Sequence, residues 1–165
     1  MRLVACLAII ALGSGHAIAD PLWQAEVRAG YGIAMGGRGD RMSTRPTPLT
    51  LAAIAAFAFN EAPPLMGYGG LLVETLDRNS VGSTFGVRLA LPGSRLRLSG
   101  GGVWLFAPFM LLGATASGGT CKQLRLRVGL CGDLQLTAYF AGDDLAPGRT
   151  VTQAELVIGV VFDAL

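Results

Sequence analysis

Apolar and polar residues alternate one by one along most of this chain. The pattern is clearest from Val151 to Phe162, where one parity, Ala154 to Phe162, is wholly apolar and the other carries Gln153 and Glu155. Successive side chains of a β-strand point to opposite faces, so this segment is predicted to be a strand with one apolar and one mixed face.

The same alternation predicts eight strands, at 23–35, 48–60, 65–76, 84–91, 95–106, 122–131, 134–141 and 151–162. Their connections alternate between long (36–47, 77–83, 107–121, 142–150) and short (61–64, 92–94, 132–133). Long loops at one end and tight turns at the other are typical of outer-membrane barrels, and an even strand number closes the sheet without a free edge. The predicted fold class is therefore all-β, an eight-stranded antiparallel up-and-down transmembrane β-barrel.

Two apolar segments fit this pattern less well. Residues 100–119 carry no charge and stop alternating after Val103, and 49–59 are apolar on both parities. A triple glycine and Pro108 disfavour a helix in the first segment, which we predict to be the upper half of a strand running into an apolar loop. A helical membrane protein remains a third hypothesis on these two segments alone.

The first residues have the organisation of an export signal. Arg2 precedes an unbroken apolar run, and Ala17-Ile18-Ala19 provides a small-x-small cleavage site. We therefore expect a cleaved signal peptide at 1–19, a β-barrel domain at 20–165, and a location in the outer membrane of a Gram-negative bacterium.

Composition adds little to this picture. Apolar residues make up 52% and charged residues 15%, which favours contact with lipid only mildly. The net charge of +2 falls to +1 when Arg2 leaves with the signal peptide, so nothing favours nucleic acid as a partner.

If the apolar parity faces lipid, the charged residues enter the barrel. An eight-stranded barrel is just wide enough to be filled by side chains, and buried charges must be paired, so we expect a packed lumen charge network rather than a pore. Its predicted members are Glu26, Arg28, Glu74, Arg88, Arg95, Arg97, Arg125, Arg127 and Glu155. The aromatic residues expected to supply the belts at the two membrane interfaces are Trp23, Tyr31, Phe57, Phe59, Phe85, Trp104, Phe140 and Phe162.

Two cysteines follow the predicted signal peptide, Cys121 and Cys131. The nine residues between them alternate without turn chemistry, and an extended run of that length places its ends roughly 30 Å apart. We predict two free or buried thiols, with a short disulfide loop as the alternative. The only histidine, His16, lies in the predicted signal peptide, so we expect no metal site and no cofactor.

The chain resembles the small eight-stranded outer-membrane barrels of the OmpA/OmpX type. The resemblance rests on RAGYGIAMGG at 28–37, on the alternation of long and short loops, and on the closing strand that ends in an aromatic residue. It implies that Phe162 is the insertion signal read by the barrel-assembly machinery, although Asp163-Ala164-Leu165 follow it here. Barrel enzymes of this size use a histidine as the base, so no catalytic residue is expected.

The predicted function is a non-enzymatic integral outer-membrane barrel that contributes to envelope structure or to surface-loop contacts. Its expected partners are outer-membrane lipid and, during insertion, the barrel-assembly machinery; a surface-loop partner is not identified. The alternative is a soluble periplasmic or secreted barrel that turns its apolar parity inward and binds a small apolar ligand.

Overall fold

The computed structural model describes residues 23–164, apart from short gaps at 39–40, 62–63, 76–78, 92–93, 144 and 146–147. The predicted signal peptide at 1–19 and its histidine lie outside the described residues.

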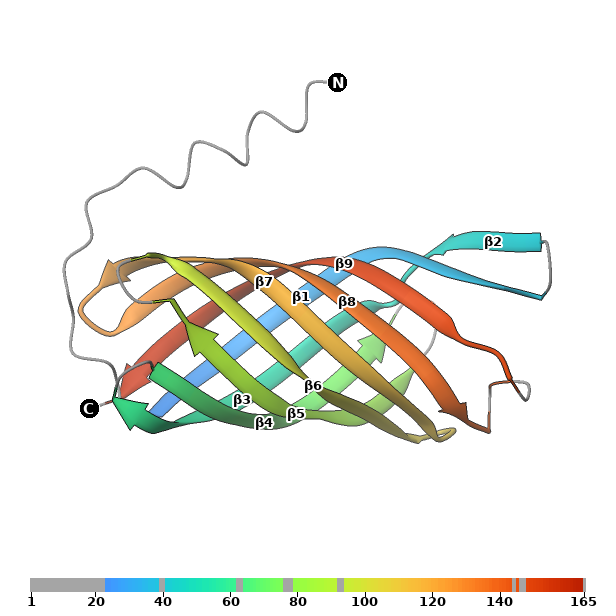
Figure 1. Ribbon diagram of the computed structural model, residues 1–165, viewed down its shortest axis with the longest axis horizontal. Coiled ribbons are helices and arrows are strands. Elements are labelled where there is room, and N and C mark those ends of the chain that lie inside the picture. Colours follow the sequence, from blue (N-terminus) through green and yellow to red (C-terminus); the bar gives the residue numbers. More distant parts are fainter. Residues whose placement is uncertain are drawn as a thin grey trace, which may run out of the picture.

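Strands form almost all of the described chain. They are β1 Trp23–Arg38, β2 Arg41–Pro46, β3 Leu49–Glu61, β4 Pro64–Thr75, β5 Ser80–Ala90, β6 Leu96–Ala107, β7 Leu111–Arg125, β8 Val128–Gly142 and β9 Val151–Ala164. Each strand from β3 to β9 is antiparallel to the next, β3 pairs with β1, and β9 returns to β1 (Figure 1). The eight strands β1 and β3–β9 thus close into an antiparallel barrel, and the predicted fold class is confirmed.

The strand β2 lies outside this closed ring. It pairs with the second half of β1, from Ile33 to Arg38, and the resulting hairpin extends beyond the barrel (Figure 1). Thr47 lies between β2 and β3 and is bonded to β1. Its backbone N–H donates to the Gly32 carbonyl at 2.9 Å, and its hydroxyl accepts from the Gly32 N–H at 2.7 Å. Much of the predicted loop at 36–47 is therefore strand.

The predicted positions of the strands and turns between residues 107 and 142 are wrong. A three-residue connection at 108–110 follows β6, and Leu126-Arg127 form the turn between β7 and β8. The expected loop at 107–121 is mostly β7, and the expected turn Gly132-Asp133 lies inside β8.

Small residues explain why β7 was missed. Its inward parity includes Gly113 and Gly119, so the hydropathy contrast between its two faces is weak. A Cβ at Gly113 would lie 3.0 Å from the Tyr139 ring, and one at Gly119 would lie 2.2 Å from an Asp133 oxygen. Both glycines leave room for larger side chains of β8 inside the barrel.

The two segments behind the helical hypothesis are strands: 49–59 belong to β3, and 100–119 belong to β6 and β7 with the connection between them. In the described ranges, no helix is both long enough and apolar enough to cross a membrane.

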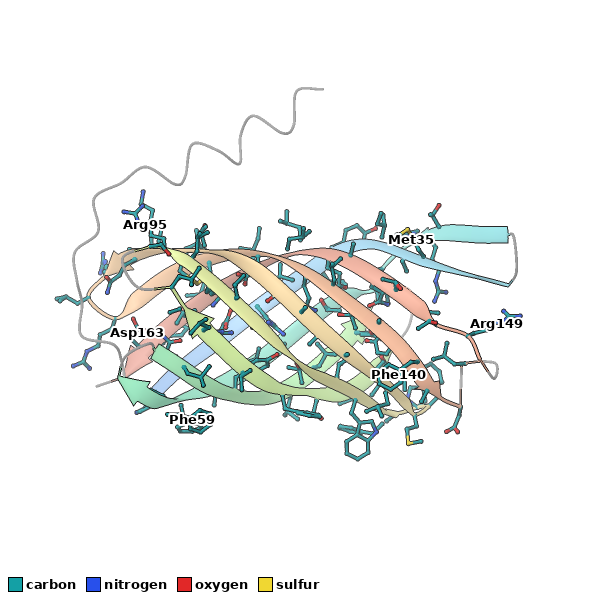
Figure 2. All side chains as sticks on the ribbon, in the orientation of Figure 1. Met35, Phe59, Arg95, Phe140, Arg149 and Asp163 are labelled. Carbon is teal, nitrogen blue, oxygen red and sulfur yellow. A yellow bond between two sulfur atoms is a disulfide. The ribbon has the colours of Figure 1, made fainter. Side chains whose placement is uncertain are left out.

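The apolar parity faces outward, as predicted. On β9, Leu156, Ile158 and Phe162 are exposed, whereas Gln153 and Glu155 are buried. Exposed aromatic residues lie toward both ends, with Phe59 near one end and Phe140 near the other (Figure 2). All eight aromatic residues predicted for the belts are exposed.

Some of these aromatic rings also cover glycines of the wall. A Cβ at Gly67 would lie 2.4 Å from the Phe59 ring, and one at Gly102 would lie 2.7 Å from the Phe85 ring. The rings therefore cover neighbouring strands at glycines, where no side chain shields the backbone.

Candidate functional site: the charged interior of the barrel

Six of the nine predicted lumen residues are buried inside the barrel. These are Glu26 and Arg28 on β1, Glu74 on β4, Arg88 on β5, Arg97 on β6 and Glu155 on β9. Each stands on the parity opposite to the lipid-facing side chains of its strand, because a strand alternates its faces with a period of two.

Four charged side chains form a connected cluster, which we call the ion-pair cluster: Glu26, Arg88, Arg97 and Asp133. The Glu26 carboxylate accepts from Arg88 Nη2 at 2.5 Å and from Arg97 Nη2 at 2.8 Å. Arg97 also binds both carboxylate oxygens of Asp133, donating from Nε at 2.9 Å and from Nη2. These contacts join β1, β5, β6 and β8 across the interior.

Sequence reasoning missed Asp133, because Gly132-Asp133 resembles a turn. The alternation along β8 could have identified it. Asp133 has the same parity as Gln135, Thr137 and Tyr139, all of which point inward. A strand assignment that began before residue 134 would therefore have included Asp133 in the interior.

Glycines give the cluster its space. A Cβ at Gly159 on β9 would lie 2.8 Å from Glu26 Oε1 and 3.2 Å from Arg28 Cβ. The Glu26 side chain therefore lies close against the backbone of the adjacent strand, which only glycine permits there. Gly119 provides similar room beside Asp133.

Arg88 makes a second kind of contact. Its guanidinium carbon lies 5.6 Å from the centroid of the Tyr68 ring, within the range of a cation–π interaction. Arg88 Nε and Nη1 make no hydrogen bond to the described residues, so Glu26 and the Tyr68 ring are the contacts that hold this cation.

A second polar region surrounds the other two buried glutamates. Ser80 Oγ donates to one Glu74 oxygen, and the Tyr139 hydroxyl donates to the other at 3.3 Å. Glu155 accepts from Gln135 Nε2 at 3.3 Å. Neutral side chains therefore donate to both oxygens of Glu74 and to one oxygen of Glu155, in place of water.

Apolar side chains fill much of the remaining interior. They come mainly from β3, β4 and β6, and they are Ala52, Ile54, Ala56, Met66, Tyr68, Leu72, Val103, Leu105, Leu111 and Tyr139. A cavity lined by Arg28, Gln135 and Glu155, among others, measures about 10 Å³, which is about the space that one water molecule needs. The interior around this cavity is thus closely packed.

Three predicted lumen residues are not in the interior, which corrects the sequence analysis. Arg95 precedes β6 and points away from the barrel (Figure 2), and Arg125 and Arg127 are exposed at the turn between β7 and β8. A register irregularity between Gln123 and Arg125 interrupts the alternation just before this turn, so parity no longer decides which way these side chains point.

The two cysteines form a disulfide, so the prediction of free thiols is wrong. Cys121 on β7 and Cys131 on β8 are direct register partners, and their Cα atoms lie 4.1 Å apart. The expected 30 Å separation assumed a single extended strand, whereas the chain reverses at Leu126-Arg127.

Phe162 lies exposed on the outer face of β9, where its register partners are Val128 on β8 and Ala25 on β1. Its role as an insertion signal stays a prediction.

The charged side chains of the interior form bonds between strands and leave few groups available for reaction. Glu26 and Asp133 are held by arginines, and Glu74 is held by Ser80 and Tyr139. Over the described ranges, no group of three or more histidine, cysteine, aspartate or glutamate side chains is arranged to hold a metal ion. The arrangement fits a cross-link between strands, in which each buried charge requires its partner.

No protein-family model and no curated protein matches the chain. Among solved structures, the chain is similar to Neisserial surface protein A, with a TM-score of 0.50, 10% identity, and coverage of 85% of this chain and 97% of that chain. It is also similar to Ail, the attachment invasion locus protein of Yersinia pestis, with a TM-score of 0.49, 11% identity, and coverage of 87% and 99%. Together with the closed sheet, the likeness to Neisserial surface protein A shows that the chain has the fold of the small eight-stranded outer-membrane barrels of the OmpA/OmpX type.

Proposed function

We propose that the protein is an integral outer-membrane barrel of a Gram-negative bacterium that works without catalysis. It contributes to the structure of the envelope or to contacts made by its loops. The observation that carries this proposal is the apolar outer wall of a barrel that encloses seven buried charged residues.

The outer wall has the chemistry of a surface in contact with hydrocarbon. Every strand of the closed barrel contributes exposed large apolar side chains, such as Val27, Leu71, Phe85, Leu134 and Ile158. Soluble monomers rarely expose one apolar patch larger than a few hundred Å², and burial of such surface stabilises by roughly 25 cal/mol per Å². A wall of this kind therefore favours lipid as its surroundings.

The alternative function, a soluble barrel around a small apolar ligand, requires the opposite arrangement. The interior instead contains seven buried charged residues, and the cavity beside Glu155 measures about 10 Å³. Ligand pockets are mostly apolar and roughly 300 Å³ or larger. The geometry thus favours the membrane barrel.

The absence of catalysis is part of the proposal. A serine nucleophile needs a nearby base, and the histidine that serves barrel enzymes as this base occurs only at His16. The buried carboxylates of Glu26 and Asp133 are engaged by arginines, so they are poorly placed to exchange protons with a substrate.

Membrane fractionation tests the proposal, with boiled and unboiled samples compared on a denaturing gel. We expect the protein in the outer-membrane fraction, with a mobility that changes on boiling because a closed barrel resists detergent until it is heated. Recovery in the soluble fraction without such a shift would contradict the proposal and favour the soluble barrel.

A further inference from the structure

The end of β7 and the turn that follows it carry an exposed group of positive and apolar side chains, which we call the tip patch: Lys122, Leu124, Arg125, Leu126 and Arg127. We propose that the tip patch binds the headgroups of anionic phospholipids, with its leucines among the lipid chains and its cations at the phosphates. This inference rests on the proposed membrane location.

The leucines of the tip patch are unusually open. Leu126 is 91% exposed at the turn, and Leu124 is 58% exposed on the strand before it. In water, an apolar side chain this exposed adds no burial of apolar surface to the stability of the fold. At the boundary between headgroups and lipid chains, the same side chain is removed from water, which is favourable.

The cations of the tip patch have no acidic partner in the described part of the chain. Lys122, Arg125 and Arg127 are exposed, and no ion pair joins them to a described carboxylate. The nearby Asp163 accepts a hydrogen bond from Gln24 Nε2 at 2.9 Å, so its carboxylate has a different partner. Three like charges on one hairpin end repel one another unless an external anion neutralises them.

The position of the tip patch indicates which anion this is. The hairpin end is tied to β9, because the Asp163 N–H donates to the Arg127 carbonyl at 2.9 Å, and Val128 is the register partner of Phe162. It therefore lies at the end of the barrel that holds both ends of the sheet-forming chain and the short turns (Figure 1), which in outer-membrane barrels is the periplasmic end. At the depth of an aromatic belt residue such as Phe162, the available anions are lipid phosphates.

The patch occupies one sector of this end only. Elsewhere around this end, β1 and β3 provide Trp23, Phe57 and Phe59 instead, which are the usual interfacial residues. A zwitterionic headgroup brings its own cation to such a site, so the excess of positive charge favours a lipid with net negative charge.

The test is lipid retention by the full-length, refolded protein, measured by native mass spectrometry with phosphatidylglycerol and phosphatidylethanolamine of identical chains. We expect the wild-type protein to bind phosphatidylglycerol more tightly. The double variant Arg125→Gln/Arg127→Gln should lose affinity for it by about fivefold for each charge removed. The matched control is Arg149→Gln, which removes an arginine at the opposite end (Figure 2) and should retain wild-type preference.

Two further measurements separate the possible causes. Leu126→Ser should weaken retention of both lipids without changing the preference between them, because it removes only the apolar contact. Inorganic phosphate should displace the lipid poorly. Displacement by phosphate at the same concentration as the lipid would overturn the inference and indicate a site for free phosphate.

Equal retention of the two lipids by the wild-type protein, or undiminished retention by the double variant, would overturn the inference. The boiling-dependent gel shift of each variant shows that the barrel has formed, so failure of lipid preference with a normal shift counts against the tip patch alone. Loss of the shift in the wild-type protein counts against the proposed function.

Discussion

At several positions in this barrel, the absence of a side chain matters as much as the bonds that neighbouring side chains make. Glu26 is 2% exposed, and its carboxylate lies against Gly159 on the adjacent strand. The alternation of the sequence places Glu26 inside, but it does not show that a glycine must face it. That requirement appears only when β1 and β9 are set in register.

Gly159→Ala tests this requirement. The added methyl group would lie 2.8 Å from Glu26 Oε1, so the carboxylate must move away from Arg88 and Arg97. We expect the free energy of unfolding to fall by about 1 to 3 kcal/mol, measured by urea titration of the protein folded in lipid vesicles.

Gly132→Ala is the matched control, because a Cβ at Gly132 meets no atom within 4 Å. The free energy of unfolding of this control should stay near that of the wild type. Equal losses for the two variants would show that the effect comes from glycine in a strand in general and not from the crowding at Glu26.

Among the elements, the β7–β8 hairpin differs most from its prediction. Its strands were expected at 122–131 and 134–141, and the actual turn at Leu126-Arg127 lacks the residues that usually mark one. The disulfide between Cys121 and Cys131 clamps the hairpin near its turn, five residues before Leu126 and four residues after Arg127. It also fixes the register between β7 and β8 two residues before Asp133, whose carboxylate accepts hydrogen bonds from Arg97.

Removal of this disulfide should loosen the hairpin. We expect Cys121→Ser/Cys131→Ser to lower the free energy of unfolding by about 2 to 4 kcal/mol, because the unfolded chain is no longer constrained. Urea titration of both proteins, with and without reductant, measures the difference.

Alkylation in denaturant provides the direct check. Without reductant, the wild-type protein should show no reactive thiol at these two positions, and after reduction it should show two. Two reactive thiols before reduction would contradict the disulfide.

At the scale of the whole molecule, the ion-pair cluster connects strands that lie far apart in the sequence. Arg97 on β6 binds Glu26 on β1 and Asp133 on β8, and Arg88 on β5 shares the Glu26 carboxylate. The two bonds to Glu26 form only when β1 faces β5 and β6 across the interior, so they couple the first strand to strands in the middle of the sequence. Buried pairs of this kind are costly to break because the remaining charge stays desolvated.

A double-mutant cycle on Arg97 and Asp133 measures this coupling. Asp133→Ala alone should cost about 3 to 5 kcal/mol, since it leaves part of the Arg97 guanidinium unpaired. Arg97→Met together with Asp133→Ala should cost less than the two single changes added together. The free energies come from unfolding in vesicles, and strictly additive losses would contradict a direct bond between the two residues.

The sequence by itself determined the kind of element, the closed eight-stranded fold class and the face of most side chains. This was possible where large apolar and charged residues alternate, as in β1 and β9, because the side-chain period of a strand is local. Only the tertiary structure decided the β1–β2 hairpin, the turn at Leu126-Arg127, the disulfide, and the exchange of Arg95, Arg125 and Arg127 for Asp133 in the interior. In β7 the faces carry small residues with little contrast, and the turn has no local marker. There the position of each residue depends on its cross-strand partner, which is a long-range property of the closed sheet.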